Sequence, residues 1–198
     1  HLPTLPFRRL LQVVPAHHGV VGIAAPPRPD LPLATSALLT GSSRTPSLAS
    51  QLEKELATAD RVDWLVSFIK WSGIRPLRQA LRDFVESGST GGDPDGDGPR
   101  LRIATTSYLG ATDWKAIEFL VGLPRTEVRV SYDTHRTRLH AKAFLFHRRT
   151  GFGSAYVGSA NVSRAALDEG LEWTAKISEH ELPWLWRQIE ASFEQHWG

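Results

Sequence analysis

The chain has 198 residues, of which 41% are hydrophobic and 22% are charged, and its formal net charge at pH 7 is +2. This size and composition are typical of one soluble domain with a core of its own. The absence of cysteine excludes disulfides and thiolate metal sites. No apolar run is long enough to span a membrane, so we expect a cytoplasmic protein. Because the chain begins with His1 and lacks methionine, we expect it to be a piece of a longer protein.

Residues 1–37 are predicted to be an irregular, linker-like segment, with one candidate edge strand at 11–15, and residues 38–198 a single domain. Four of the residues between 26 and 32 are prolines, which lack the N–H group that regular structure needs. Apolar spacing predicts helices at 47–59, 74–86, 113–121 and 182–197, and a short helix from Ser163. Ser47 and either Thr112 or Asp113 are predicted to cap their helices.

Strands are predicted at residues 61–69, 100–106, 126–132, 142–146, 155–158 and 171–177. Helices and strands alternate in the middle of the chain, and strands then follow one another. This order predicts an α/β fold, in which helices cover both faces of one mixed sheet.

Two short motifs stand close together in the second half of the chain. His140 and Lys142 are two residues apart, and Gly158, Ser159 and Asn161 form Gly-Ser-x-Asn. On a strand, residues i and i+2 point to the same face, so we expect each pair of polar side chains to project together. Two neighbouring strands would then surround one point with an imidazole, an ammonium, a hydroxyl and an amide. That set of groups suits attack on a phosphodiester.

Positive charge is concentrated in the same part of the sequence. Between residues 128 and 167 the only acidic residue is Asp133. The same window holds Arg129, Arg136, Arg138, Lys142, Arg148, Arg149 and Arg164, with His135, His140 and His147. A basic face around the motif favours an anionic polymer, and a solvated surface of ordinary arginine content is the alternative.

The two motifs resemble the signature of the phospholipase D superfamily, in which His-x-Lys is followed by Gly-Ser-x-Asn. The resemblance implies a phospholipase D-like fold over residues 38–198 and a phosphodiesterase that needs no metal and no cofactor. It implies that His140 is the nucleophile and forms a covalent phosphohistidine. Lys142 would hold the phosphate, and Ser159 and Asn161 would donate hydrogen bonds to its oxygens.

The sequence departs from the fuller family pattern at one position. That pattern has an Asp five residues after the Lys, where this chain has His147. Nucleases of the family often lack this Asp and carry a Glu beyond the Asn, which is the position of Glu172. The resemblance therefore implies nucleic acid as substrate, with Glu172 orienting His140. His147 is expected to be structural or to contact phosphate.

Each of these residues also has a purely structural interpretation. His140 could be a hydrogen-bonded core histidine and Lys142 a surface lysine in a salt bridge. The Gly-Ser-Ala-Asn segment could be a turn that caps the helix starting near Ser163. Glu172 could pair with an arginine on an edge strand.

Further substrate contacts are expected at the ends of predicted strands, where open α/β sheets bind their ligands. Lys70, Thr105 and Tyr108 follow such strands, and Arg138 belongs to the basic segment before His140. Trp173, beside Glu172, is predicted to be a core residue in preference to a base-stacking one.

Only one copy of the motif is present, whereas a family active site uses two. The second copy is expected from a twofold homodimer with a shared active site, or from elsewhere in the parent protein. The chain also resembles the N-terminal phospholipase D-like domain of bacterial superfamily II helicases, including modification-directed restriction enzymes. This implies DNA as substrate and a helicase domain as partner. The alternatives are a non-catalytic module for DNA binding or dimerisation and, less favoured, a phospholipid hydrolase.

Overall fold

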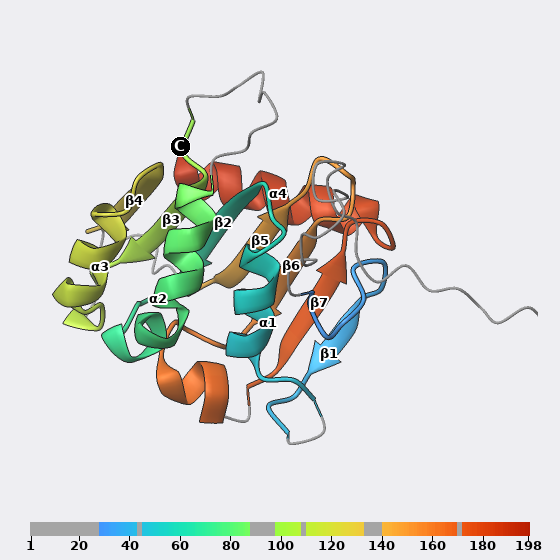
Figure 1. The fold of residues 1–198 in the computed structure, drawn as a ribbon, viewed down its shortest axis with the longest axis horizontal. Coiled ribbons are helices and arrows are strands. Elements are labelled where there is room, and N and C mark those ends of the chain that lie inside the picture. The colour runs from blue at the N-terminus through green and yellow to red at the C-terminus, as the bar shows by residue number, and fades with distance from the viewer. Residues whose placement is uncertain (1–27, 43–44, 88–97, 108–109, 133–139, 170–171) are drawn as a thin grey trace, which may run out of the picture.

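The computed structural model in Figure 1 describes residues 28–42, 45–87, 98–107, 110–132, 140–169 and 172–198. Its centre is a seven-stranded sheet in the order β1-β7-β6-β5-β2-β3-β4. In chain order the strands are β1 (Ala37–Leu39), β2 (Arg61–Val66), β3 (Leu101–Thr106), β4 (Thr126–Ser131), β5 (Lys142–His147), β6 (Ser154–Gly158) and β7 (Thr174–Ser178). Strands β2, β3 and β4 run parallel, and every other neighbouring pair is antiparallel.

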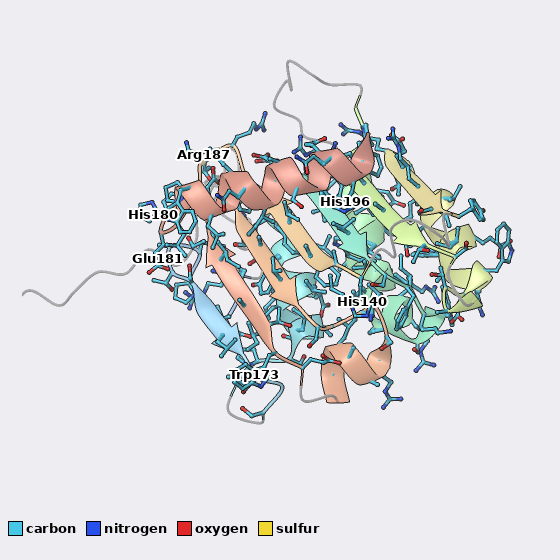
Figure 2. All side chains as sticks on the ribbon, turned by 180° about the vertical axis from the view of Figure 1, so that it is seen from behind. His140, Trp173, His180, Glu181, Arg187 and His196 are labelled. Carbon is cyan, nitrogen blue, oxygen red and sulfur yellow. The ribbon has the colours of Figure 1, made fainter. Side chains whose placement is uncertain are left out.

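Helices cover both faces of this sheet. The helices α1 (Leu48–Leu56), α2 (Trp71–Glu86) and α3 (Trp114–Val121) lie on the face toward the viewer in Figure 1. Helix α4 (Pro183–Trp197) crosses the opposite face, which Figure 2 shows from behind. A π-helical turn, η3 (Ala165–Glu169), follows β6. The predicted α/β fold, a mixed sheet between helices, is confirmed.

Alternation along the strands divides the core into two apolar layers. Trp64, Phe144 and Tyr156 are buried against the face that α1, α2 and α3 cover. Their strand neighbours Leu65 and Leu145 are buried on the other face, against α4. Each such side chain stabilises the fold by about 1.5–3 kcal/mol relative to leaving it exposed.

The element boundaries differ from prediction where a contact from a distant residue decides them. Helix α2 begins at Trp71 and not at residue 74, because the Asp113 carboxylate accepts a hydrogen bond from the Trp71 N–H at 2.8 Å. Asp113 stands at the predicted cap position of α3 but makes no capping bond to its own helix. Ser47 does cap α1, by accepting from the Ser50 N–H at 3.2 Å.

The described end of the predicted linker packs against β7. Lys176 is buried, and its ammonium donates to the carbonyls of Pro32 and Thr35 at 2.8 and 2.9 Å. The Ser178 hydroxyl donates to the Leu33 carbonyl at 2.6 Å. The division at residue 37 stays a prediction, and the candidate strand at 11–15 lies outside the described residues. Within the described ranges, no helix is both long and apolar enough to cross a membrane.

A buried charged cluster joins β2, β3 and β5 to α4. The fully buried carboxylate of Asp63 accepts two hydrogen bonds from Arg102, at 2.7 and 2.8 Å, and lies 2.6 Å from His147 Nε2. Arg102 also bonds Glu194 of α4 at 2.7 Å. His147, which stands where the family pattern has an Asp, therefore has a structural role at the end of β5 opposite Lys142.

Asp63 should make the fold sensitive to acid. Burial alone would raise the pKa of this carboxyl, but hydrogen bonds from Arg102 and His147 outweigh it and hold the pKa at about 2, below the ordinary 3.8. The carboxylate therefore stabilises the fold in full above about pH 4, by about 2 kcal/mol, and this contribution is lost as the pH falls through 2. Urea unfolding at stepped pH should show Asp63→Asn less stable at pH 7, by a margin that shrinks toward pH 2.

The matched control for this experiment is Glu127→Gln, which breaks the exposed pair with Arg129. Exposed ion pairs contribute little, so its stability should follow the parent protein at each pH. A margin for Asp63→Asn that stays constant from pH 7 to pH 2 would contradict the assignment.

Candidate active site

The two motifs meet because β5 runs antiparallel to both of its neighbours. Lys142, the first residue of β5, is in register with Val66, the last residue of β2. Ala143 is likewise in register with Val157 near the end of β6. The segments that leave β2 and β6 and enter β5 and β7 therefore gather at one edge of the sheet, here called the motif edge. Figure 2 labels His140 and Trp173 along it, below α4.

His140 and Lys142 converge, as the sequence predicted. Lys142 Nζ lies 3.0 Å from His140 Nδ1 and donates to the His140 carbonyl oxygen at 2.7 Å. The lysine is buried, with 5% of its surface exposed, and the histidine is exposed. The strand begins only at Lys142, so the side chains are brought together by this hydrogen bonding and not by strand alternation.

The contact with Lys142 fixes the protonation of the imidazole ring. An ammonium group can only donate, so Nδ1 must accept and a neutral His140 carries its proton on Nε2. A ring in that form has no free lone pair on Nε2. A nucleophilic Nε2 requires the proton on Nδ1, which in turn requires Lys142 to move off the ring.

Burial lowers the pKa of Lys142, and the charge of Glu172 opposes this by raising it. Glu172 was predicted to orient His140. In the structure its carboxylate accepts a hydrogen bond from the Ser159 hydroxyl. Glu172 therefore acts on the site through the charge of Lys142, and the hydroxyl of Ser159 is already engaged.

The side-chain oxygen of Asn161 is held by the backbone, because Oδ1 accepts from the Phe68 N–H at 3.3 Å. This bond engages the oxygen of the amide, and the two N–H groups on Nδ2 are donors of the kind that serve an anion. The same loop forms a parallel bridge between Val162 and Ile69, and the Lys70 N–H donates to the Val162 carbonyl at 2.7 Å.

Two glycines allow this close approach. A Cβ on Gly73 would lie 2.6 Å from Ser163 N, so only glycine lets the start of α2 lie against the loop that carries Asn161. A Cβ on Gly158 would overlap the Trp173 carbonyl oxygen and lie 2.8 Å from the Thr174 Cα. The motif therefore has glycine at position 158 because β6 packs closely on β7 there. Sequence reasoning missed Gly73, because its partner is distant in the chain.

The remaining predicted contacts are not brought to the site as a group. Lys70 lies near it but pairs with Asp113 at 3.1 Å. A backbone hydrogen bond from Trp71, more than Lys70 itself, lowers the pKa of Asp113. Thr105 is buried and donates to the Ser67 carbonyl at 3.4 Å, so it is not available to a ligand. Tyr108 and Arg138 lie outside the described residues.

Trp173 corrects a prediction, because 66% of its surface is exposed although it was expected in the core. Strand β7 begins one residue later, at Thr174, whose side chain is the buried one. The Trp173 carbonyl oxygen accepts from the Ser159 N–H at 3.3 Å, and contact between these backbones leaves the indole outside.

The described residues of the basic stretch do not share one face. Strand β5 carries the chain from the motif edge to the opposite edge, where Arg148 and Arg149 line a separate pocket of about 420 Å³. Arg148 is buried against Glu55, and Arg129 pairs with Glu127. Among the described residues of the stretch, Arg129, Arg148 and Arg149 are therefore engaged in ion pairs or lie at the opposite edge. The described residues contain no cluster of three histidine or carboxylate side chains suited to a metal ion.

No protein-family model matches the chain, and no curated protein has a significantly similar sequence. The structure is similar to NucT from Helicobacter pylori, with a TM-score of 0.55 at 14% identity over 82% of this chain and 94% of that one. It is also similar to Nuc from Salmonella typhimurium, a phospholipase D family member, with a TM-score of 0.48 at 16% identity over 82% and 95%. At these identities the likeness shows the fold alone. The seven-stranded mixed sheet with helices on both faces is the fold that the chain shares with NucT.

Proposed function

We propose that the chain is a phosphodiesterase domain that cleaves DNA through a phosphohistidine intermediate. One observation carries the proposal. The exposed imidazole of His140 lies 3.0 Å from the buried ammonium of Lys142, at the motif edge. A buried cation is retained where it has an anion to bind, and an exposed imidazole beside it can reach that anion's phosphorus.

The chemistry begins when a phosphate of the substrate draws Lys142 away from His140. The ring can then carry its proton on Nδ1, and Nε2 attacks phosphorus. An N–P bond forms as the P–O bond to the leaving group breaks, and the leaving oxygen takes a proton from a general acid. Water then attacks phosphorus and gives its proton to the former general acid, which is now a neutral imidazole. The N–P bond breaks and the nucleophilic imidazole is released. Lys142 and the Nδ2 donors of Asn161 stabilise the negative charge that develops on the phosphate oxygens.

The general acid in this scheme is the His140 of a second copy of the chain. One copy of the motif supplies one exposed imidazole, and the general acid is a second one that carries protons on both nitrogens, so that the loss of one proton leaves a neutral ring. A twofold dimer in which the two motif edges face each other supplies both. In this proposal a helicase domain of the parent protein delivers the DNA. That part of the proposal rests on the sequence resemblance.

A second candidate, phospholipid hydrolysis, is favoured by one observation. A largely apolar pocket of about 340 Å³ lies beside Lys142, between the sheet and α4, with Leu145 and Ile189 in its lining. Such a pocket takes an acyl chain as well as a nucleobase. The sequence resemblance to nucleases makes DNA the preferred substrate.

Removal of the imidazole tests the nucleophile. His140→Ala should lower DNA cleavage by more than about a thousandfold and leave DNA binding largely intact. Lys142→Ala should lower cleavage by about 100- to 1,000-fold and also weaken binding. The measurement is cleavage of labelled DNA in EDTA, which should not reduce the rate.

The matched control is His180→Ala, an exposed histidine that stacks on Phe152 away from the motif edge. DNA that is bound but never cut would assign the chain to the non-catalytic alternative. Hydrolysis of phosphatidylcholine vesicles without cleavage of DNA would assign it to lipid. Activity lost in EDTA and restored only by a divalent ion would contradict the metal-free mechanism.

The pH profile tests the role of Glu172. Because burial lowers the pKa of Lys142, the alkaline fall of kcat/KM should come below the ordinary lysine value of 10.5. Glu172→Gln removes the charge that raises this pKa, so the fall should move to lower pH. Glu118→Gln, on the exposed side of α3, should leave it unmoved. An alkaline fall that stays in place in Glu172→Gln would refute the electrostatic role.

Mixed subunits test the shared site. Wild-type chains that exchange with an excess of His140→Ala chains should lose activity as the square of the wild-type fraction, because each mixed dimer holds one imidazole. The fraction of dimers is checked by sedimentation. A simple proportional loss, in a preparation shown to exchange, means that each chain cuts alone.

A further inference from the structure

Exposed aromatic rings gather at the motif edge. Trp173 is 66% exposed, Trp114 is 76% exposed and Tyr132 is 78% exposed. Trp173 directly precedes β7, Tyr132 directly follows β4, and Trp114 begins α3 after β3. Among the described residues, the other large exposed aromatic side chain is Trp184, at the start of α4.

Strand directions place these rings on both sides of His140. Strands β3 and β4 are parallel to β2 and end at the motif edge, and β7, antiparallel to β6, begins there. Along this edge β7 lies two strands from β5 on one side, and β4 lies three strands away on the other. At about 4.8 Å per strand, Trp173 belongs to a strand about 10 Å from that of Lys142, and Tyr132 to one about 14 Å away.

The Trp173 side chain lies on the same side of the sheet as the apolar pocket. Thr174 lines a pocket with Leu48 of α1, and the Ser159 N–H bond to the Trp173 carbonyl extends the pairing of β6 and β7 by one residue. Trp173 therefore points to the opposite face, which α4 crosses and on which Figure 2 labels it. Helix α4 crosses that face nearer the other edge and leaves the indole uncovered. The pocket beside Lys142 opens on this face and is lined by Val157 and Gly158 of β6, the strand between β7 and β5.

We propose that Trp173 is a stacking platform for an unpaired base, and that the substrate is a single strand running along the motif edge. This rests on the proposed function, which puts the scissile phosphate at Lys142 and His140. A ring carried two strands away from that phosphate stands within a few nucleotides of it along an extended strand. In a duplex each base stacks on its neighbours and offers no face to a protein ring, so such a platform selects single strands.

The test measures binding of a short oligothymidylate to His140→Ala protein, which keeps the DNA intact. Trp173→Ala, added to this background, should weaken binding by about 5- to 150-fold, the range for losing one base–aromatic stack. Trp173→Phe should recover most of the loss. Trp184→Ala removes the same side chain, 56% exposed, from the start of α4 and should change nothing.

An abasic oligonucleotide makes the test specific to stacking. A series of oligonucleotides carries one abasic site, each at a different position. In the protein that retains Trp173, one position of the abasic site should weaken binding. In Trp173→Ala, an abasic site at that same position should weaken binding no further. Affinity for a duplex of the same length should not depend on Trp173.

The outcomes separate this proposal from the proposed function. If Trp173→Ala cleaves and binds single strands as well as the parent protein does, the stacking role of Trp173 is wrong and the proposed nuclease activity is unaffected. Equal losses for single strand and duplex also overturn the stacking role. A change in oligomeric state in Trp173→Ala would assign the ring to a protein interface. DNA neither bound nor cut by any form of the protein overturns both proposals.

Discussion

Strand β5 lies antiparallel between β2 and β6, and the rest of the site depends on this pairing. It puts the beginning of one strand beside the ends of two others, so that Lys142 is in register with Val66. The Asn161 loop then returns over the end of β2, where its amide is fixed by the Phe68 N–H. A one-residue slip of β5 would turn Lys142 to the other face and move Phe144 and Phe146 from the layer under α1 and α2 to the layer under α4.

The far end of β5 is where that register is fixed. His147 is held by Asp63 on one face, and Arg148 is held by Glu55 on the other at 2.5 Å. Glu55 also accepts from the Tyr156 hydroxyl at 2.8 Å, and burial, with the charge of Glu55, raises the pKa of that phenol. Buried ion pairs add little net stability over apolar residues, but an unpaired buried charge is costly. Each pair therefore penalises a shifted register more than it stabilises the correct one.

The sequence carried enough information for the fold and for the central pair of the site. Apolar spacing located the helices and the strands β2 to β7 within a few residues but did not predict β1. The His-x-Lys spacing located two side chains that do converge. Prediction from the sequence failed where the deciding partner is distant. Asp113 determines where α2 begins, and Gly73 determines how near the Asn161 loop can lie. It failed again for the basic stretch, because a strand that crosses the sheet separates Arg148 from Lys142.

The exposure of Trp173 is another feature that the local sequence did not predict. An indole next to a strand is more often buried than exposed, and the local sequence does not distinguish the two cases. The exposure follows from Gly158, whose missing side chain lets the backbones of β6 and β7 touch at the Trp173 carbonyl. The glycine of the motif thus has two consequences at once. It brings Ser159 and Glu172 close to Lys142, and it turns an aromatic ring outward at the edge where a phosphate would bind.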